Sequence, residues 1–296
     1  MSVDEGEWLA KQFEEHRAQL RAVAYRMLGS LSDADDAVQE AWLRLSRSGA
    51  DGVQNLAGWL TTVVGRVCLD MLRSRTARRE EPLGVHVPDP IVTPEDGTGP
   101  ENEALLADSV GLALLVVLGT LAPAERLAFV LHDMFGVPFD QIAATMNRSP
   151  NAARLLASRA RRRVQGTAAM PDTDLAHQRE IVDAFFAASR KGDFDALVAL
   201  LDPDVIVRAD YGATPAGGPA QVRGAAAVAK QALRFSRLAP FVQPALVNGT
   251  AGAVVAPGGQ PSTILGFTVR RGKITEIDIL ADPARLRQLD LPVLNS

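Results

Sequence analysis

The sequence of 296 residues predicts a multidomain chain in which two all-α domains precede one α+β domain. As far as about residue 165, apolar residues recur at the spacing of amphipathic helices. Beyond Gly166, helices are followed by alternating or β-branched segments, the order of an α+β fold with a curved antiparallel sheet. Residues 80–102 are rich in Pro, Gly and acids and lack a helical period, so they predict an irregular linker between the helical domains.

The composition is that of an ordinary soluble globular protein, with 47% hydrophobic and 22% charged residues. The net charge of −4 argues against a protein that coats nucleic acid, although local patches steer partners regardless of totals. The single cysteine, Cys68, excludes a disulfide framework or a cysteine zinc site. His16, His86, His132 and His177 lie far apart and lack metal-ligand spacing. We therefore expect no metal and no cofactor.

Neither a targeting signal nor a membrane span is predicted. Residues Met1 to Lys11 are acidic and lack the basic start and apolar run of a signal peptide. The longest apolar run, Val110 to Ala122, is too short to cross a bilayer. We therefore expect a cytoplasmic protein without a membrane partner.

Trp8 to Arg47 predicts two helices separated near Gly29-Ser30. Ser32 or Asp33 is expected to cap the second helix, whose early acids suit the positive end of the helix dipole. The polar side of this second helix carries Asp33, Asp35, Asp36, Gln39 and Glu40. Taken alone, these acids indicate only a solvated helix start.

Asn55 to Arg79 predicts a third helix with a broad apolar face and a basic face. A single acid, Asp70, is opposed by Arg66, Arg73, Arg75, Arg78 and Arg79. Such a helix suits single-stranded DNA, because arginines pair with phosphates while bases stack or enter pockets. Trp59 fits a base platform or, by the burial habits of tryptophan, the core. Asn55 and the loop before it are the better candidates for a base pocket.

Val137 to Val164 predicts a helix-turn-helix. Pro138 to Met146 suits a first helix, and Asn147-Arg148-Ser149 a three-residue turn. Ser149 can cap the second helix, and Pro150 suits its first position because a missing N–H costs nothing there. Beyond the turn, one face repeats Ala153, Leu156, Ala160 and Val164, and another repeats Asn151, Arg154, Ser158 and Arg162.

The charge of the second helix predicts DNA binding. No acid occurs between Asp140 and Asp172, whereas the same stretch contains Arg148, Arg154, Arg159, Arg161, Arg162 and Arg163. A helix with one packed and one arginine-rich face matches a recognition helix in the major groove. Its first residues would reach base edges, and its later arginines would hold phosphates.

The last part of the chain predicts the α+β domain. Its expected helices are Leu175–Arg190, Phe194–Leu201 and Gly224–Arg237. Its expected strands are Val205–Arg208, Val242–Asn248, Gly252–Ala256, Thr263–Arg270 and Lys273–Leu280. Gly258-Gly259 and Arg271-Gly272-Lys273 fit hairpin turns between them.

Several of these segments resemble bacterial sigma factors of the extracytoplasmic-function (ECF) class. Leu121 to Arg163 resembles their region four, and Asp33 to Leu43 resembles the region-two helix that docks on the clamp of RNA polymerase. Asn55 to Arg66 resembles their −10 element reader. Phe129–Asp133 and Arg148–Arg154 resemble one subgroup, whose members carry a C-terminal SnoaL-like (NTF2-like) cone.

The resemblance implies an ECF sigma factor, not an enzyme, that binds core RNA polymerase and directs initiation at promoters. Its expected parts are region 2 at 8–79, a linker at 80–102, region 4 at 103–166 and a SnoaL-like regulatory domain at 174–291. The β′ clamp helices and the β flap of the polymerase would be its contacts, together with promoter DNA. An acidic surface that meets a basic partner also gives fast, oriented docking.

Site residues follow from the same resemblance. Core polymerase would be bound by Asp36, Gln39 and Glu40. The −10 element would be bound by Asn55, Trp59, Arg66, Arg73 and Arg75. The −35 element would be bound by Arg148, Ser149, Asn151, Arg154, Ser158, Arg159 and Arg162.

Three short motifs resemble those of the subgroup. His86 to Ile91 resembles its linker motif Trp-Leu-Pro-Glu-Pro, with His86 in place of the tryptophan and Asp89 in place of the glutamate. Asp282 to Leu286 resembles Asn-Pro-Asp-Lys-Leu, and Asp210 and Gly212 match two positions of Asp-Gly-Gly-Gly-Lys. The third domain would then regulate the others, without a separate anti-sigma factor, through Pro88, Asp89, Pro90, Asp210, Gly212, Asp282, Pro283 and Leu286.

Other functions stay open at this point. An ordinary repressor would use the helix-turn-helix alone and have no need of Asp36. A polyketide cyclase or isomerase would need an acid–base carboxylate in an apolar cone, for which the candidates are Asp210, Tyr211, Asp278 and Asp282. A cone without chemistry that senses a small molecule is the more plausible role, because fold does not fix function.

Overall fold

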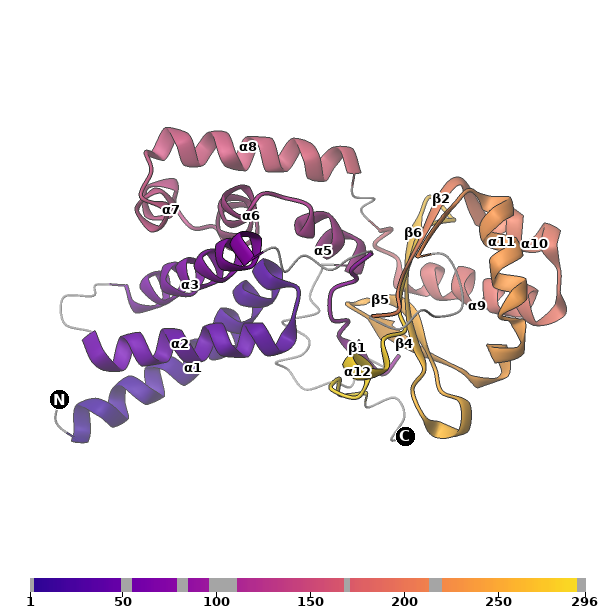
Figure 1. Cartoon of the computed structure of the whole chain (residues 1–296), viewed down its shortest axis with the longest axis horizontal. Coiled ribbons are helices and arrows are strands. Elements are labelled where there is room, and N and C mark those ends of the chain that lie inside the picture. Colours follow the sequence, from indigo (N-terminus) through magenta and orange to yellow (C-terminus); the bar gives the residue numbers. More distant parts are fainter. Residues whose placement is uncertain are drawn as a thin grey trace. The chain divides into compact units, whose positions relative to one another are not determined.

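The computed structural model describes residues 3–48, 55–78, 85–95, 111–167, 171–212 and 220–291. Contacts divide the chain into two compact units. One comprises the described residues of 1–81 and 117–167, and the other those of 82–116 and 168–296 (Figure 1). Within the described ranges, no helix combines the length and the apolar character that a membrane span needs.

Three helices form the first half of the first unit: α1 (Val3–Leu28), α2 (Leu31–Ser48) and α3 (Leu56–Arg78). The expected break near Gly29-Ser30 is confirmed, and Gly29 ends α1 with a φ of 70°. The predicted cap is wrong by two or three residues. Because α2 already begins at Leu31, Ser30 precedes it, and its hydroxyl accepts from the Asp33 N–H at 3.4 Å.

The second half of this unit contains α6 (Pro123–Phe129), the π-helical turn η1 (Val130–Met134), α7 (Phe139–Met146) and α8 (Pro150–Thr167). The helical stretch from Pro123 to Met134 is therefore divided, and its last turn is wound more widely. α5 (Leu112–Gly119) precedes them. The predicted helix-turn-helix is confirmed in α7 and α8.

The two halves of the first unit pack on each other where α3 has a glycine. A Cβ atom at Gly65 would lie 3.1 Å from methyl carbons of both Leu127 and Leu131. The buried Arg126 donates to Met27 O at 2.8 Å and to Gly119 O at 2.7 Å. An arginine at the last carbonyls of α1 suits the negative end of that helix. The helices before and after the linker, which the sequence predicts as two separate domains, thus share one core.

The second unit is built on a seven-stranded sheet of order β1-β4-β5-β6-β7-β2-β3. Its strands are β1 (Val92–Thr93), β2 (Leu201–Asp210), β3 (Gln221–Arg223), β4 (Val242–Val247), β5 (Thr250–Val255), β6 (Thr263–Arg270) and β7 (Lys273–Leu280). Only β2 and β7 pair in parallel among these strands; the other pairs are antiparallel. The α+β architecture predicted from the sequence is confirmed.

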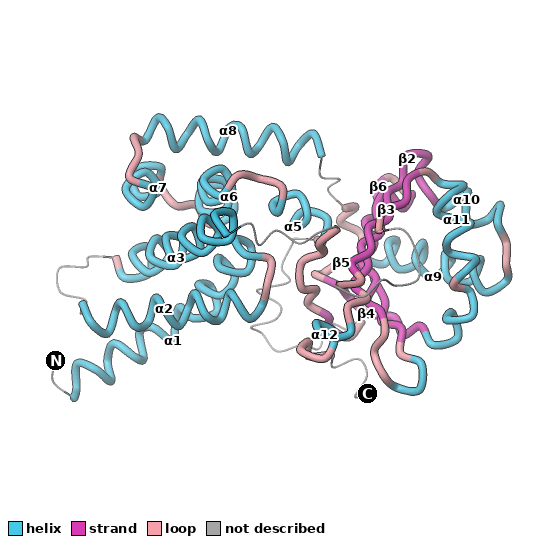
Figure 2. Tube along the Cα trace, in the orientation of Figure 1, coloured by secondary structure: helices cyan, strands magenta, loops and turns pink. Residues whose placement is uncertain are grey.

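Helices cover one face of this sheet (Figure 2). They are α9 (Leu175–Lys191), α10 (Phe194–Leu200), α11 (Ala225–Arg234) and the 3₁₀ helix η2 (Ser236–Phe241). Phe185 and Phe186 of α9 meet Phe267 of β6 edge-on, at ring separations of 5.5 and 5.6 Å. These aromatic contacts anchor the core between helices and sheet.

Two tight hairpins shape the sheet. Arg271 and Gly272 turn between β6 and β7 with φ of 50° and 73°, as predicted. Asn248 and Gly249 turn between β4 and β5 with φ of 51° and 75°, a hairpin signal that the sequence reading overlooked. Gly258-Gly259 lie in a longer loop that contains the 3₁₀ helix η3 (Pro257–Gly259).

Candidate functional site

The acidic surface expected on α2 is partly open and partly paired. Asp33 pairs with Arg75 at 2.5 Å, and Asp35 pairs with Arg21 at 2.6 Å. Glu40 accepts from Arg44, one turn later on the same helix, at 2.9 Å. Asp36 and Gln39 are exposed, and Asp36 forms no ion pair with another described residue. Asp36 is therefore the acid on this face whose charge is most available to a partner.

The basic face of α3 is divided in the same way. Arg66 and Arg73 are exposed, and Arg73 lies 3.9 Å from the carboxylate of Asp70. Arg75 is half-buried against Asp33, so its charge helps to hold α3 on α2. The exposed Asn55 caps α3, because its Oδ1 accepts from the Gly58 N–H at 2.9 Å.

Gly58 and Trp59 begin α3 next to this cap. A Cβ atom at Gly58 would come within 2.9 Å of the Asn55 amide nitrogen, so the glycine leaves room for the cap. Trp59 is half-buried and therefore neither a fully exposed platform nor a fully buried core residue. Asn55 and Trp59 lie close together at the start of α3, and the sequence did not show that the Asn55 side chain has a partner there.

The turn of the helix-turn-helix has the predicted local chemistry. Asn147 adopts the left-handed conformation, with a φ of 53°, and ends α7. The Ser149 hydroxyl accepts from the Ala152 N–H at 3.2 Å, which confirms the predicted cap. Ala143 and Ala153 are buried, so that α7 and α8 approach closely.

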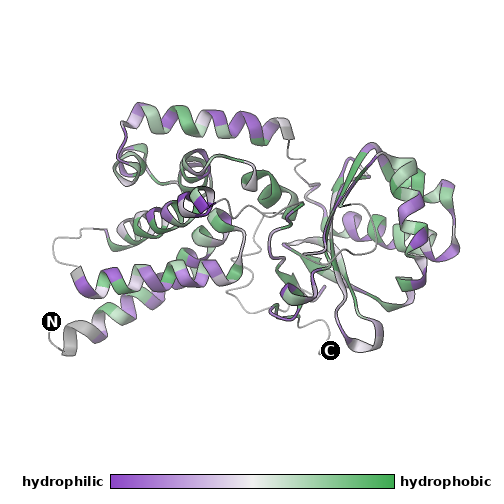
Figure 3. Ribbon diagram, in the orientation of Figure 1, coloured by the Kyte–Doolittle hydropathy of each residue, from purple (hydrophilic) through white to green (hydrophobic). Residues whose placement is uncertain are grey.

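Arginines of α8 fall into two groups. Arg161 pairs with Asp133 at 2.5 Å and Arg163 with Glu125 at 3.2 Å, so both brace α8 against the preceding helices. In contrast, Arg159 and Arg162 of α8, and Arg148 in the turn before it, are exposed and form no ion pair with the described residues. Figure 3 shows hydrophilic residues along the length of α8. The free arginines give this surface a positive charge that is not neutralised internally.

The start of α8 carries a second set of polar side chains. Arg154 and Asn151 are exposed, and the Arg154 guanidinium donates to Asn151 Oδ1 at 2.9 Å. Arg154 also lies 5.5 Å from the centre of the Phe139 ring, which orients it by a cation–π contact. Ser158 is half-buried one turn further on. A pre-oriented Arg–Asn pair at this position can read base edges.

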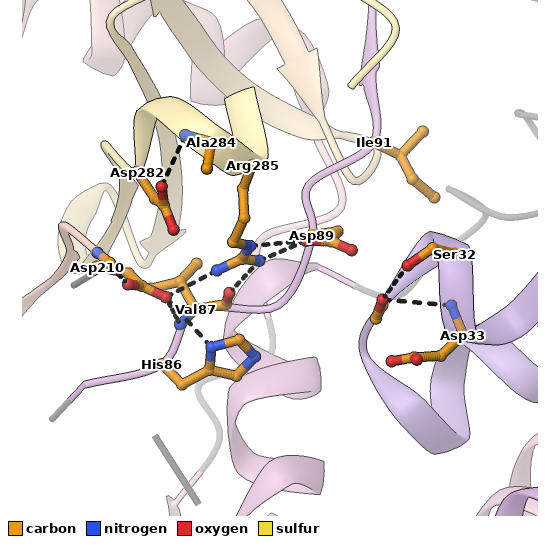
Figure 4. Close-up of polar contacts among 12 residues, drawn as sticks. Ser32, Asp33, His86, Val87, Asp89, Ile91, Asp210, Asp282, Ala284 and Arg285 are labelled. Atoms are coloured by element: carbon orange, nitrogen blue, oxygen red, sulfur yellow. Dashed lines mark hydrogen bonds and ion pairs between the residues drawn. The ribbon is translucent and has the colours of Figure 1, made fainter. Parts of the chain in front are cut away.

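In the second unit, one arginine gathers the subgroup motifs (Figure 4). Arg285, in the short helix α12 (Pro283–Leu286), donates through Nε to Asp89 Oδ1 at 2.9 Å. Its Nη1 donates to Asp210 Oδ2 at 2.7 Å, and its Nη2 to Val87 O at 2.7 Å. His86 Nδ1 lies 3.2 Å from the same Asp210 carboxylate oxygen. The linker is thereby held to the ends of the sheet; we call His86, Val87, Asp89, Asp210 and Arg285 the linker clasp.

Asp210 is the acceptor at the centre of the linker clasp. Burial alone would raise its pKa, but hydrogen bonds from His86, the Gly212 N–H and the Val87 N–H, with the charge of Arg285, lower the pKa to about 2. The Val87 N–H donates at 3.0 Å and the Gly212 N–H at 3.0 Å. The carboxylate therefore stays ionised throughout the physiological range.

A second contact continues the linker into the sheet. Ile91 and Asn248 exchange hydrogen bonds: the Ile91 N–H donates to Asn248 Oδ1 at 3.1 Å, and the Asn248 N–H donates to Ile91 O at 2.8 Å. Val92-Thr93 then pair with β4 as strand β1. The prediction of an irregular linker is wrong at Val92 and Thr93, because backbone pairing with a distant strand replaces the missing local period; residues 85–91 have neither helix nor strand, as predicted. The buried Pro88 and Pro90 flank the half-buried Asp89.

Two further motif residues shape the loop that presents Asp210. Gly212 has a φ of 65°, and a Cβ atom there would lie 2.4 Å from the Asp282 carboxylate, so glycine is required. Asp282 caps α12 by accepting from the Ala284 N–H at 2.8 Å. Pro283 begins that helix, and Leu286 is 2% exposed. The expected regulatory residues thus cluster in one place.

Sequence reasoning missed Arg285 and Asn248. Arg285 stands where the subgroup motif has a lysine, and its partner Asp89 is the acid of the linker motif. The two residues lie 196 positions apart, so the sequence alone does not pair them. Asn248 belongs to an Asn-Gly pair, which is a local hairpin signal that was available.

The proposed acid–base candidates do not share a cavity. Asp278 and Glu276 both accept from Arg208, at 3.1 and 2.6 Å, on the sheet face opposite the helices. Asp210 and Asp282 are bound in the clasp and the α12 cap. Only Tyr211, of the four candidates, lines the cavity of the second unit. Within the described ranges no cluster of His, Cys, Asp and Glu could hold a metal ion.

Comparisons with known proteins match both units. Two segments match family models: residues 12–78 match Sigma-70 region 2, and residues 111–164 match Sigma-70 region 4. The chain is 41% identical to the ECF RNA polymerase sigma factor SigJ of Mycobacterium tuberculosis, across 92% of this chain and 91% of that protein. It is 36% identical to the probable ECF RNA polymerase sigma factor SigI of that species, across 93% of both. The crystal structure of SigJ superposes with a TM-score of 0.78 at 38% identity, covering 93% of this chain and 97% of that one.

Proposed function

Since the chain belongs to the family of ECF RNA polymerase sigma factors, we propose which of its surfaces bind the polymerase and the promoter. Core polymerase is bound by α2, through Asp36, Gln39 and Glu40. The exposure of Asp36 and Gln39, and the absence of an ion pair to Asp36 among the described residues, support this assignment. An unpaired acid attracts a basic clamp surface without first breaking an internal ion pair.

Promoter DNA is bound by two helices. Arg66 and Arg73 of α3, with Asn55 and Trp59 at its start, face the −10 element, and Arg75 supports them from its pair with Asp33. The exposed side of α8 faces the −35 element. There Asn151 and Arg154 read bases, while Ser149 and Ser158 with the free arginines Arg148, Arg159 and Arg162 hold the backbone.

The polymerase assignment is tested by pull-down of purified core polymerase with the full-length chain. We expect the triple variant Asp36→Ala, Gln39→Ala, Glu40→Ala to lose most of its binding. The matched control is Glu14→Ala with Glu15→Ala, two exposed acids of the neighbouring helix α1, which should bind as the wild type does. Equal binding by the triple variant would show that α2 is not the polymerase surface and favour duplex binding by the helix-turn-helix alone.

The third domain regulates the other two by holding the linker, and no separate anti-sigma protein is needed. The observation that carries this proposal is the linker clasp, in which one guanidinium bonds the linker at Asp89 and Val87 and the third domain at Asp210. Because the linker joins region 2 to region 4 in the chain, a held linker limits how far these regions can move apart.

Run-off transcription with purified core polymerase tests the regulation. Arg285→Met removes the guanidinium that joins Asp89 and Val87 to Asp210, and it should raise transcription several-fold without any added protein. Arg287→Met changes an exposed arginine just after α12 and should leave transcription unchanged. If Arg285→Met initiates no better than the wild type while its linker is released, the clasp does not restrain activity.

A further inference from the structure

A cavity of about 150 Å³ lies inside the second unit, between the sheet and the helices α9, α11 and η2. Its wall is mainly aliphatic and aromatic, with Phe185, Phe186, Leu238, Val255 and Ile277 among the residues that line it. The established family activity, at the polymerase and the promoter, makes no use of this space. A preformed apolar cavity with a few polar groups is the usual form of a small-molecule site.

Three polar side chains point to the kind of ligand. Tyr211, Gln231 and Thr263 line the cavity, and their side-chain polar groups form no hydrogen bond with another described residue. Ser189 also lines it, but its hydroxyl already donates to Ala232 O at 3.4 Å. None of the described residues that line the cavity carries a charge. The wall therefore offers hydrogen bonds but no counter-ion.

We infer that this cavity binds a neutral molecule with a single ring and one or two hydroxyl or carbonyl oxygens. A cavity of about 150 Å³ lined by apolar side chains is large enough for benzene. A carboxylate or an amine would lose its hydration without an opposite charge to replace it, so charged analogues are excluded. The oxygens of the ligand would bond Tyr211, Gln231 or Thr263.

The cavity and the linker clasp share a segment of backbone. Asp210 ends β2 and takes part in the clasp, and the next residue, Tyr211, lines the cavity. The hydrogen bonds to Asp210 therefore fix the position of Tyr211. A ligand that contacts Tyr211 in this position binds the docked linker state better than the released state, and by linkage it strengthens docking.

Binding can be measured by ¹⁹F NMR, because the chain has two tyrosines, Tyr25 and Tyr211. The full-length protein labelled with 3-fluorotyrosine is titrated with benzyl alcohol and, for comparison, with benzoate. We expect the Tyr211 resonance to move with benzyl alcohol while Tyr25, which is 0% exposed in the first unit, does not. Benzoate should bind at least about tenfold more weakly, equivalent to about 1.4 kcal/mol. Tyr211→Phe assigns the two resonances.

Two variants locate the site. Ala232→Leu fills the cavity from α11 and should weaken benzyl alcohol binding at least about tenfold. Ala227→Leu adds the same bulk on the exposed side of α11 and should bind as the wild type does. No movement of the Tyr211 resonance up to saturating benzyl alcohol, an equal response to benzoate, or full binding by Ala232→Leu would each overturn the ligand site.

Coupling between the cavity and the linker is measured without polymerase. Its failure can therefore be told apart from a failure of the proposed function. Arg285→Met should lower the affinity for benzyl alcohol, because Tyr211 is then less fixed. In the wild type, benzyl alcohol should slow hydrogen exchange at the Val87 and Ile91 amides. Unchanged affinity in Arg285→Met, together with unchanged exchange, would show that the cavity and the clasp are independent.

Discussion

At the scale of single residues, Asp278 is a buried acid whose carboxylate accepts from Arg208. It is 1% exposed, and burial raises its pKa to about 6; Arg208 opposes this rise, and the nearby Glu276 adds to it. A carboxyl group whose pKa is higher in the folded chain than the ordinary 3.8 binds its proton more tightly when folded. Its contribution to stability is therefore greatest below about pH 4 and is lost as the pH rises through about 6.

Asp278→Asn should keep the shape of this site and abolish its titration. The free energy of unfolding should then vary less between about pH 4 and 6 and be higher than in the wild type near neutral pH. Urea unfolding followed by far-UV circular dichroism at a series of pH values measures both. Asp195→Asn, an exposed acid of α10, is the control and should keep the wild-type profile. If Asp278→Asn kept the wild-type dependence of stability on pH, Asp278 would not be the group that titrates in this range.

Arg285 is the residue on which the linker clasp depends. Arg285→Met leaves Asp89 and Asp210 without their shared cation, and loss of one partner from a largely buried pair costs about 3 kcal/mol. We expect faster hydrogen exchange at the Val87 and Ile91 amides. Arg285→Lys, which restores the residue of the subgroup motif, should recover part of the protection because a lysine keeps the charge but cannot bridge both acids. Protection that survives in Arg285→Met would assign docking to β1 and Asn248 instead.

Asp210 shows the opposite dependence on pH. Its pKa is lowered to about 2, so the stability that it gives to docking is present above the ordinary value of 3.8 and lost as the pH falls toward 2. The ionisation of Asp210 therefore does not make linker docking depend on pH near neutrality.

Among the secondary-structure elements, α8 carries both arginines that brace it and arginines that stay open. Arg161 and Arg163 are engaged with Asp133 and Glu125, whereas Arg159 and Arg162 are not engaged with described residues. The helix is therefore braced on one side and charged on the other. Sequence alone predicted a row of arginines but could not divide them, because the partners lie on helices 28 and 38 residues earlier.

Replacing the open Arg162 and the Asn151-bound Arg154 should have different effects. Arg162→Ala should weaken binding to all DNA duplexes alike and reduce the salt dependence of binding by about one counterion. Arg154→Ala should cost about 1–3 kcal/mol and relax the preference at one base pair of the −35 element. Both effects can be measured as the affinity of the holoenzyme for promoter duplexes at several salt concentrations.

Arg161→Ala is the control for this pair, because its side chain already bonds Asp133. It should lower the stability of the helix-turn-helix with little change in the salt dependence of binding. An equal salt effect from Arg161→Ala and Arg162→Ala would remove the distinction between bracing and phosphate-binding arginines.

Local signals explain which elements could be predicted. The helix-turn-helix was found from Ser149 and Pro150, whose capping chemistry acts within one turn, and β6 and β7 from alternation within each strand. The order of the strands could not be predicted from the sequence. β1 pairs with β4 across about 150 residues, and the linker itself shows no alternating strand pattern. The role of Arg285 could not be predicted for the same reason, because its partners are also distant in sequence. The cap of α2 was misplaced because Ser30 and Ser32 offer the same hydroxyl.

On the scale of whole units, the packing of α3 on α6 is the least expected feature. It depends on Gly65, where a side chain would meet Leu127 and Leu131, and on Arg126, which reaches the end of α1. Burial lowers the pKa of Arg126 to about 10, with the charge of Arg75 acting in the same direction, so the guanidinium is still charged at neutral pH. The helices of region 2 and the supports of the helix-turn-helix thus form one body.

Gly65→Leu should disrupt this packing. The added side chain has no space beside Leu127 and Leu131, and overpacking of a core costs about 1–3 kcal/mol. We expect faster hydrogen exchange in α6 and a larger radius of gyration in solution scattering. Gly119→Leu is the matched control, since a Cβ atom there has no neighbour within 4 Å. Unchanged exchange and size in Gly65→Leu would show that α3 and α6 do not need the glycine.

The contact at Gly65 also sets a condition on promoter reading. Elements at −10 and −35 are separated by about 25 base pairs, or about 85 Å along B-form DNA. The 23 residues of α3 extend only about 35 Å, and α3 touches the support of the recognition helix directly. In the proposed function, α3 and α8 read these two elements, and the contact at Gly65 keeps both helices within one compact unit. We therefore expect this junction to open when both elements are bound, so that a change which weakens the junction speeds initiation.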